Sequence, residues 1–293
     1  MIKKFPSLGI KSAFIKAFQQ NQYLSFVTTW KTDNAGVSAS NQITIPVVTT
    51  GAVYDCVVDW GDGTLSIITT FDDPNWTHTY ATAGTYEVKI TGVFNALRFG
   101  NGGDKLKILD VSNWGIFVSN GFVTFQGCSN MTITAKDTPQ ITNWNQTFRD
   151  CASITTFAGL GNLVLQNGGF NFIFAGCTNF NEPSFEDIDT SLVTNIAGAL
   201  SAAPSFDQKL GNLKIGNATN MNNFLASSEL SAANTNLTYV GWAAQAPNLP
   251  SGITIHMGTS KYNTTAGGVD GVAAKSILTS APYNLAFIDG GIQ

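Results

Sequence analysis

The sequence predicts a mainly β protein in which a sheet-forming N-terminal block precedes an array of short repeats. Thr, Asn and Gly account for 33, 27 and 29 of the 293 residues; Thr favours strands, whereas Asn and Gly favour turns. Apolar runs with strand-like alternation are concentrated before residue 95. A phenylalanine-based motif recurs after residue 118 with a period of about 25 residues, which indicates stacked repeats.

The composition excludes several classes of protein. The hydrophobic share of 43% is large enough for a buried core, and the charged share of 12% is too small for a coiled coil. The net charge of −4 argues against general nucleic-acid binding. No apolar run approaches the roughly 20 residues of a membrane helix. We therefore expect neither a nucleic-acid partner nor membrane insertion.

Residues 1–23 are expected to form a helical anchor segment. Apolar residues recur there at helical spacing, and five lysines (Lys3, Lys4, Lys11, Lys16 and Lys31) precede the first acidic residue, Asp33. A helix this short is marginal alone in water, so we expect it to dock on the body of the protein or on a partner. The candidate anchor residues are Ile10, Lys11, Phe14, Lys16 and Phe18. The alternative is a lysine-rich terminus that only maintains solubility.

Residues 24–95 are predicted to form strands joined by tight turns. The predicted strands are residues 24–30, 43–48, 54–60, 65–68, 77–80 and 85–90. The Gly61-Asp62-Gly63-Thr64 turn and the alternation of Tyr86, Val88 and Ile90 are the clearest signals. The segments Val58–Thr64 and Thr77–Ile90 resemble a PKD-type domain. That resemblance implies an immunoglobulin-like β-sandwich that acts as a spacer or adhesion module.

Residues 96–230 contain the repeats. Five anchor positions, Phe125, Phe148, Phe174, Leu200 and Leu225, follow one another at spacings of 23, 26, 26 and 25. Three of them begin a Phe-x-x-Cys box that ends at Cys128, Cys151 or Cys177. This period suits a solenoid with one strand per turn, in which stacked turns share one core. We predict that these eight residues form that core.

The repeats resemble the BspA-like leucine-rich-repeat family, which is also known from mycoplasma surface lipoproteins. The match lies in the Phe-x-x-Cys boxes and in Asn-apolar dipeptides such as Asn195-Ile196 and Asn220-Met221. The resemblance implies a leucine-rich-repeat-like solenoid. Residues 231–293, with Leu237–Ala244 as an array-like ending, are predicted to form its C-terminal cap.

The cysteines and histidines give no metal-binding pattern. Successive members of Cys56, Cys128, Cys151 and Cys177 lie more than 20 residues apart, too far for common zinc spacings. We expect buried free thiols, with a disulfide between adjacent turns as the alternative. His78 and His256 are expected to be structural. No Walker loop or dinucleotide fingerprint occurs, so we expect no cofactor.

The densest acidic cluster is Glu182, Glu186, Asp187 and Asp189. Carboxylates could bind calcium or hydrolyse glycans, but the cluster lacks calcium-loop spacing. We expect the cluster to lie in a solvated loop, and the sequence leaves open whether it binds calcium.

The sequence is compatible with three functions. The first is a non-enzymatic bacteriophage virion surface protein, a spike, fibre or capsid decoration subunit with an adhesion role. No signal-peptide-like apolar run is visible, because Pro6, Gly9 and Lys11 interrupt it. The expected partners are capsid or tail proteins, bound through the N-terminal segment, and a host surface glycan or protein; we also expect a homo-oligomer. The second is a bacterial cell-surface adhesin of the same plan, and the third a glycan-active enzyme.

Overall fold

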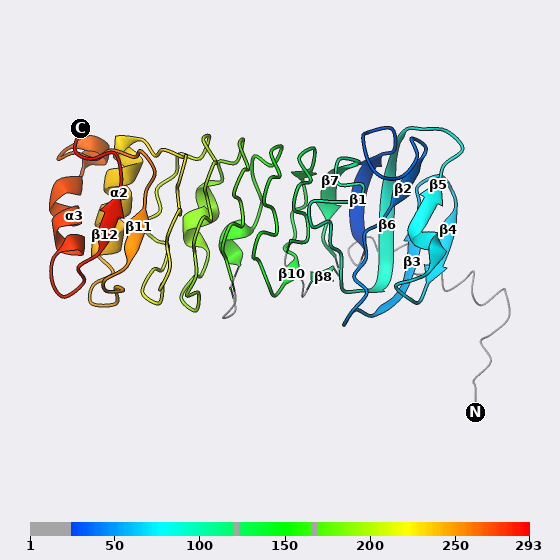
Figure 1. Cartoon of the computed structure of the whole chain (residues 1–293), viewed down its shortest axis with the longest axis horizontal. Helices are drawn as coiled ribbons and strands as arrows, with labels where there is room; N and C mark the ends of the chain where they lie inside the picture. Colours follow the sequence, from blue (N-terminus) through cyan, green and yellow to red (C-terminus); the bar gives the residue numbers. More distant parts are fainter. Residues whose placement is uncertain (1–24, 116, 120–122, 164, 166–168) are drawn as a thin grey trace, which may run out of the picture.

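The computed structural model describes residues 25–115, 117–119, 123–163, 165 and 169–293, and this part of the chain is mainly β with few helices. Figure 1 shows an elongated molecule in which a strand-rich block, a stack of chain turns and a helix-bearing end follow one another. The elements in chain order are β1 (Phe26–Lys31), β2 (Gln42–Thr44), β3 (Tyr54–Asp59), β4 (Leu65–Ile68), η2 (Pro74–Trp76), β5 (Thr77–Thr79), β6 (Thr85–Phe94), β7 (Ile108–Asn113), β8 (Val118–Ser119), β9 (Thr132–Ile133), β10 (Gln140–Ile141), η3 (Leu160–Asn162), η4 (Pro183–Asp187), α2 (Ala232–Ala243), β11 (Thr254–His256), η5 (Ala266–Gly268), α3 (Gly271–Thr279) and β12 (Ala286–Ile288).

The N-terminal block is built on an open six-stranded sheet in the order β4-β3-β6-β1-β7-β9. Side chains that alternate along each strand define the two faces of the sheet: Tyr54, Cys56 and Val58 of β3 are buried on one face, whereas Asp55 is exposed on the other. β1 is antiparallel to both β6 and β7, and β7 pairs in parallel with β9. The sheet thus continues from the N-terminal block into the repeat region. The division of the chain between residues 95 and 96 stays a prediction.

A two-stranded antiparallel ribbon of β2 and β5 completes this block. The Tyr80 hydroxyl donates to the carbonyl of Trp60 at 3.0 Å, and the Trp60 indole N–H donates to Ser66 Oγ at 2.9 Å. The imidazole of His78 stacks on Trp60 with the ring centroids 4.7 Å apart. These contacts hold the ribbon against the turn between β3 and β4.

Successive turns of chain stack through backbone hydrogen bonds in the repeat region. Each anchor residue donates its N–H to a carbonyl in the next turn: Phe125 to Thr147, Phe148 to Ile173, Phe174 to Ala199, Leu200 to Phe224 and Leu225 to His256, at 2.8 to 3.1 Å. The spacing of the anchors is therefore the length of one turn.

The stacked turns do not each contain a regular β-strand. Between β10 and β11 the β structure of the described residues is limited to isolated bridges, such as Asn195 with Asn220. The reason is a column of left-handed residues, Gln146, Phe172, Gly198 and Asn223, with φ between 52° and 61°. A left-handed residue breaks the extended backbone that a long ladder needs, so the expectation of a strand in every turn is not met here.

Two buried charged residues, Lys107 and Asp104, link the segment before β7 to the loop before β2. Lys107 is fully buried, and its ammonium donates to the carbonyls of Ser38, Ala39 and Gln42 at 2.8 to 3.1 Å. The carboxylate of Asp104, also fully buried, accepts the N–H groups of Val37, Ser38 and Thr44 at 2.7 to 3.0 Å. Both charges are thus hydrogen-bonded, as buried charges must be to avoid a large desolvation cost.

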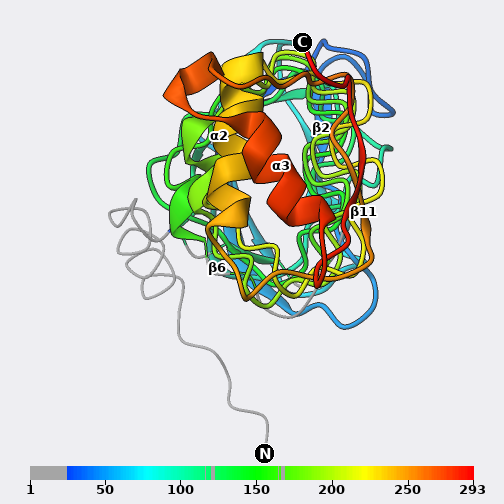
Figure 2. The same cartoon turned by 90° about the vertical axis from the view of Figure 1, so that its left-hand side faces the viewer.

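The C-terminal region closes the stack with helices. The sequence pattern at residues 237–244 resembles an array ending, whereas the structure forms α2 there, with Ser231 as its N-cap. Val240 and Trp242 of that pattern belong to the helix, and Trp242 is fully buried. β11 and β12 form a parallel pair. Figure 2 shows α3 lying across the end of the stack.

One hydrophobic cluster runs through the described chain, from Phe26 in β1 to Leu285 just before β12. Within the residues that the structure describes, no helix is long and apolar enough to cross a membrane.

Candidate functional site

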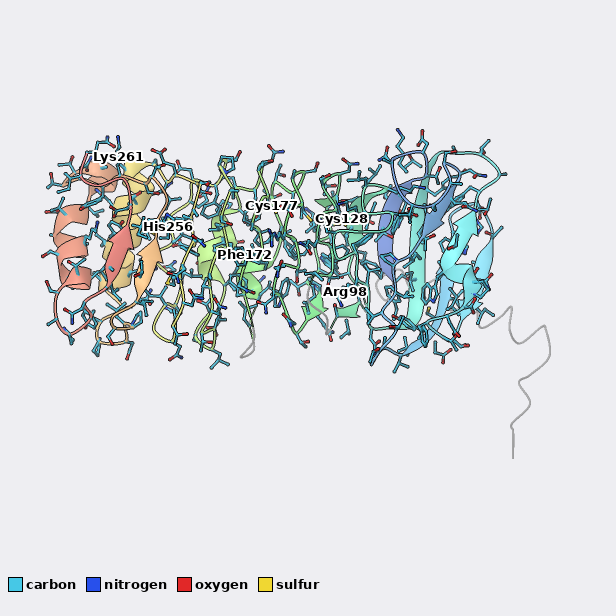
Figure 3. All side chains as sticks on the ribbon, in the orientation of Figure 1. Arg98, Cys128, Phe172, Cys177, His256 and Lys261 are labelled. Carbon is cyan, nitrogen blue, oxygen red and sulfur yellow. The ribbon has the colours of Figure 1, made fainter. Side chains whose placement is uncertain are left out.

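The eight predicted repeat-core residues form columns inside the stack. Phe125, Cys128, Phe148, Cys151, Phe174, Cys177, Leu200 and Leu225 are all fully buried. The rings of Phe125, Phe148 and Phe174 stack in order, with centroids 5.7 and 5.5 Å apart. Cys128 and Cys177 lie at different positions along the long axis of the stack but at a similar level across it (Figure 3). These residues supply packing.

None of the four cysteines has the properties of a reactive thiol. All four are buried free thiols, and burial raises the pKa of Cys128, Cys151 and Cys177, and that of Cys56 to about 12. A thiol with a raised pKa stays protonated at neutral pH and is a poor nucleophile and metal ligand.

The cysteine position also has a hydrogen-bonding role that sequence reasoning missed. Cys151 Sγ donates to the carbonyl of Phe125 at 3.1 Å, and Cys177 Sγ donates to that of Phe148 at 2.9 Å. In a later turn, Ser228 Oγ donates to the carbonyl of Leu200 at 2.8 Å. The shared signal in the sequence is a small donor three residues after the anchor.

The two histidines lie in different surroundings. His78 Nε2 is 2.8 Å from Asp62 Oδ2, in the turn between β3 and β4. His256 Nδ1 is 3.4 Å from Asn223 Oδ1 on the stack. Neither histidine is placed beside the other, so they form no joint site.

The acidic cluster separates into individual structural contacts. Glu182 caps η4 by accepting the N–H of Ser184 at 3.0 Å, and Asp189 accepts that of Ser191 at 3.0 Å. Glu186 is buried, pairs with Lys209 and accepts the N–H of Asn212. In the described part of the chain, no three His, Cys, Asp or Glu side chains gather as a metal site would require.

A groove beside this cluster is the candidate functional site. It has a volume of about 1100 Å³ and is lined by three segments, Glu186 to Ser191, Asn212 to Asn217, and Ala244 to Leu249. The first contains the end of η4, and the last follows α2. The Gln245 amide donates to the carbonyls of Gly211 and Leu213 at 3.0 and 2.9 Å, which fixes the end of α2 against the second segment.

Polar and apolar groups line the groove to about the same extent. Asp187, Asp189 and Lys214 provide charges, and Asn217 and Asn248 provide amides. Hydrogen bonds from Ser191 lower the pKa of Asp189, which keeps that carboxylate ionised and able to accept. Mixed carboxylate and amide groups over an aliphatic floor at Ile188 suit a polar ligand. Sequence reasoning found only the acidic side, because the segment after α2, Ala244 to Leu249, completes the lining from a distant part of the chain.

The five candidate anchor residues, Ile10, Lys11, Phe14, Lys16 and Phe18, lie outside the described residues. The structure therefore brings the sequence-predicted core residues together and leaves the anchor untested.

The repeat region is similar to a known family. A family model described as "Mycoplasma protein of unknown function, DUF285" matches residues 119–239. The matched segment includes all five anchor positions, from Phe125 to Leu225, and ends inside α2. Searches of the curated proteins and of the solved structures found no match.

Proposed function

We propose that the protein is a non-enzymatic surface protein of a bacteriophage virion, a spike, fibre or capsid decoration subunit with a recognition role. The observation that supports it best is the single core from Phe26 to Leu285 in an elongated chain (Figure 1). Close-packed interiors have low compressibility. Such a body can hold one end at a fixed distance from the other, as a spike or fibre must.

The finer fold is part of this proposal. We infer a PKD-like, immunoglobulin-like sandwich followed by a short BspA-like leucine-rich-repeat solenoid with a C-terminal cap. The turn in Val58–Thr64, closed by the Trp60 N–H to Thr64 carbonyl bond at 3.2 Å, supports the first part. The matched family over residues 119–239 and the turn-to-turn hydrogen bonds support the second.

The two ends of the molecule are assigned different tasks. Residues 1–23, which contain four lysines and no acid, attach the protein to an acidic capsid or tail surface. The groove is formed by residues between 186 and 249 and contacts a host surface glycan or protein through its carboxylates and amides. Copies of the chain associate as a homo-oligomer on the particle.

Deletion of residues 1–22 tests the proposal on particles. Quantitative mass spectrometry of purified particles from the source should find the intact chain as a stoichiometric component. The truncated chain should fold but fail to incorporate, and charge reversal at Lys11 and Lys16 should weaken incorporation more at low salt than at high salt. Absence of the intact chain from purified particles would refute the virion role.

A bacterial cell-surface adhesin is the second candidate, favoured by the similarity to a family described from Mycoplasma. An export signal in a longer gene, and loss of the protein when intact cells are treated with protease, would favour it. Release of sugar from a glycan would instead favour a glycan-active enzyme.

A further inference from the structure

An apolar patch lies on the outer face of the six-stranded sheet. It consists of Val53, Val57, Leu65, Ile67 and Val93, and we call it the outer patch. Val53, Ile67 and Val93 are 58%, 50% and 47% exposed. The register places Val57 opposite Ile67, which joins the patch across β3 and β4 at these two residues. Contiguous exposed apolar surface marks an interaction site more often than scattered apolar residues do.

Acidic side chains border the outer patch and also interrupt it, because Asp55 lies between Val53 and Val57 on the same face of β3. Asp55 lies opposite Val93, and Asp59 lies opposite Leu65, so both carboxylates share the face of the patch. Glu87 is on the same face of β6, paired with Lys89 at 2.8 Å. These four side chains carry a net charge of −2. Two copies of this face would bring like charges together, so a basic, apolar occupant fits better than a second copy of the patch.

The N-terminal end of β1 lies in line with the outer patch, in one row of opposite residues that crosses the sheet. Ser25 Oγ and Thr91 Oγ1 are 2.9 Å apart, Thr91 is opposite Val57, and Val57 is opposite Ile67. The row from β1 to β4 crosses three strand spacings, or about 14 Å. The six residues from 19 to 24 can span up to about 20 Å when extended. Phe18 is therefore within reach of Ile67 in the same molecule.

We propose that residues 1–22 dock on the outer patch of their own chain in the free protein. Their apolar residues Ile10, Phe14 and Phe18 cover the patch, and their four lysines lie against its acidic border. This segment has the required chemistry, because its sequence contains no acid. The docking itself does not depend on the proposed function; if that function holds, the segment is stored on the sheet until a partner competes for it.

Thiol labelling of the full chain tests the docking. A cysteine at Ile67 is compared with one at Leu192, a residue on the repeat stack that is 49% exposed and so matches the 50% of Ile67. The native cysteines are buried and react slowly. A soluble maleimide should label Ile67→Cys at least roughly tenfold more slowly than Leu192→Cys, because labelling requires the segment to open.

Two controls identify the occupant. In a Phe14→Asp/Phe18→Asp background the two labelling rates should become equal. The protection should not change on dilution, and light scattering should show that it is independent of oligomeric state. Equal rates in the parent chain would overturn the proposal, as would protection that appears only with self-association, which would identify a second copy as the occupant. Val93→Cys serves as a second probe if Ile67→Cys does not fold.

Discussion

Among single residues, the cysteine column shows how a repeat position combines packing with a hydrogen bond. Cys151 is fully buried and its thiol donates to the turn before it. Cys151→Gln should reduce the free energy of unfolding by about 3 kcal/mol or more, because it buries an amide that the column cannot satisfy. Cys151→Ala should cost about 1 to 2 kcal/mol through the cavity and the lost bond. Urea denaturation measures both.

Ser228 supplies the matched control for this series. Its hydroxyl makes the equivalent bond to Leu200 in a later turn, so Cys151→Ser should retain more stability than Cys151→Gln. If all three variants unfold at the same urea concentration as the parent protein, Cys151 is not in a dry column and the alignment of the repeats is wrong.

Asp62 makes stability depend on pH. Burial alone would raise its pKa, but hydrogen bonds from Thr64 and His78 outweigh that effect and lower it from the ordinary 3.8. A carboxyl with a lowered pKa in the folded state stabilises the protein above its unfolded value and loses that contribution as pH falls through the folded value. Stability should therefore fall less for Asp62→Asn than for the parent between about pH 5 and pH 2.

Denaturation midpoints across this pH series check the effect of Asp62. The exposed Asp72 is the control, and Asp72→Asn should keep the acid dependence of the parent. Parallel curves for the parent and Asp62→Asn would show that the carboxyl contributes nothing through its partners.

Among the elements, α3 and the residue after β12 are joined by a partly buried ion pair. Lys275 Nζ of α3 lies 2.6 Å from Asp289 Oδ2, and the Tyr239 hydroxyl donates to the same oxygen at 2.6 Å. The ammonium also lies 4.3 Å from the centroid of the Tyr262 ring. The pair joins the last helix to the residue after the last strand, so it controls how tightly the cap closes.

Breaking this pair should open the cap before the stack. Lys275→Met leaves the Asp289 carboxylate buried with fewer partners, at a cost of about 3 kcal/mol. Hydrogen exchange should accelerate in residues 271–288 with little change in residues 125–200. The double variant Lys275→Met/Asp289→Leu should recover part of the loss, because it removes the unpaired charge. Uniform acceleration across the chain would show that the cap and stack unfold together.

For the whole molecule, the continuous core predicts cooperative unfolding. β1 pairs with β6, in the N-terminal block, and with β7, which follows residue 95. If the N-terminal block or the stack unfolded alone, the other part would therefore lose a strand partner. Tryptophan fluorescence, which reports Trp30 and Trp60 in the block as well as Trp242 in the cap, should follow the same urea transition as far-UV circular dichroism. Two separated transitions would show that the sheet block and the stack unfold independently.

The sequence predicted the features that depend on neighbours along the chain. The apolar runs on either side of the Gly61–Thr64 turn predicted β4 at residues 65–68 and β3 to within one residue of its end. The anchor spacing predicted the length of each turn, because every turn must return an apolar residue to the same column. The similarity to a known family covers this same repeat region, residues 119–239.

The tertiary structure decided what depends on contacts between distant segments. The pairing of β1 with β7 joins residues about 80 apart and merges the sheet with the stack, and no local pattern encodes such a pairing. α2 forms where an array-like ending was expected, because Tyr239 and Trp242 are buried along it. The groove forms where the segment after α2 lies near the end of η4 and residues 212–217. Local periodicity fixes the repeat and its buried columns, whereas surfaces between segments follow only from how the turns and helices pack.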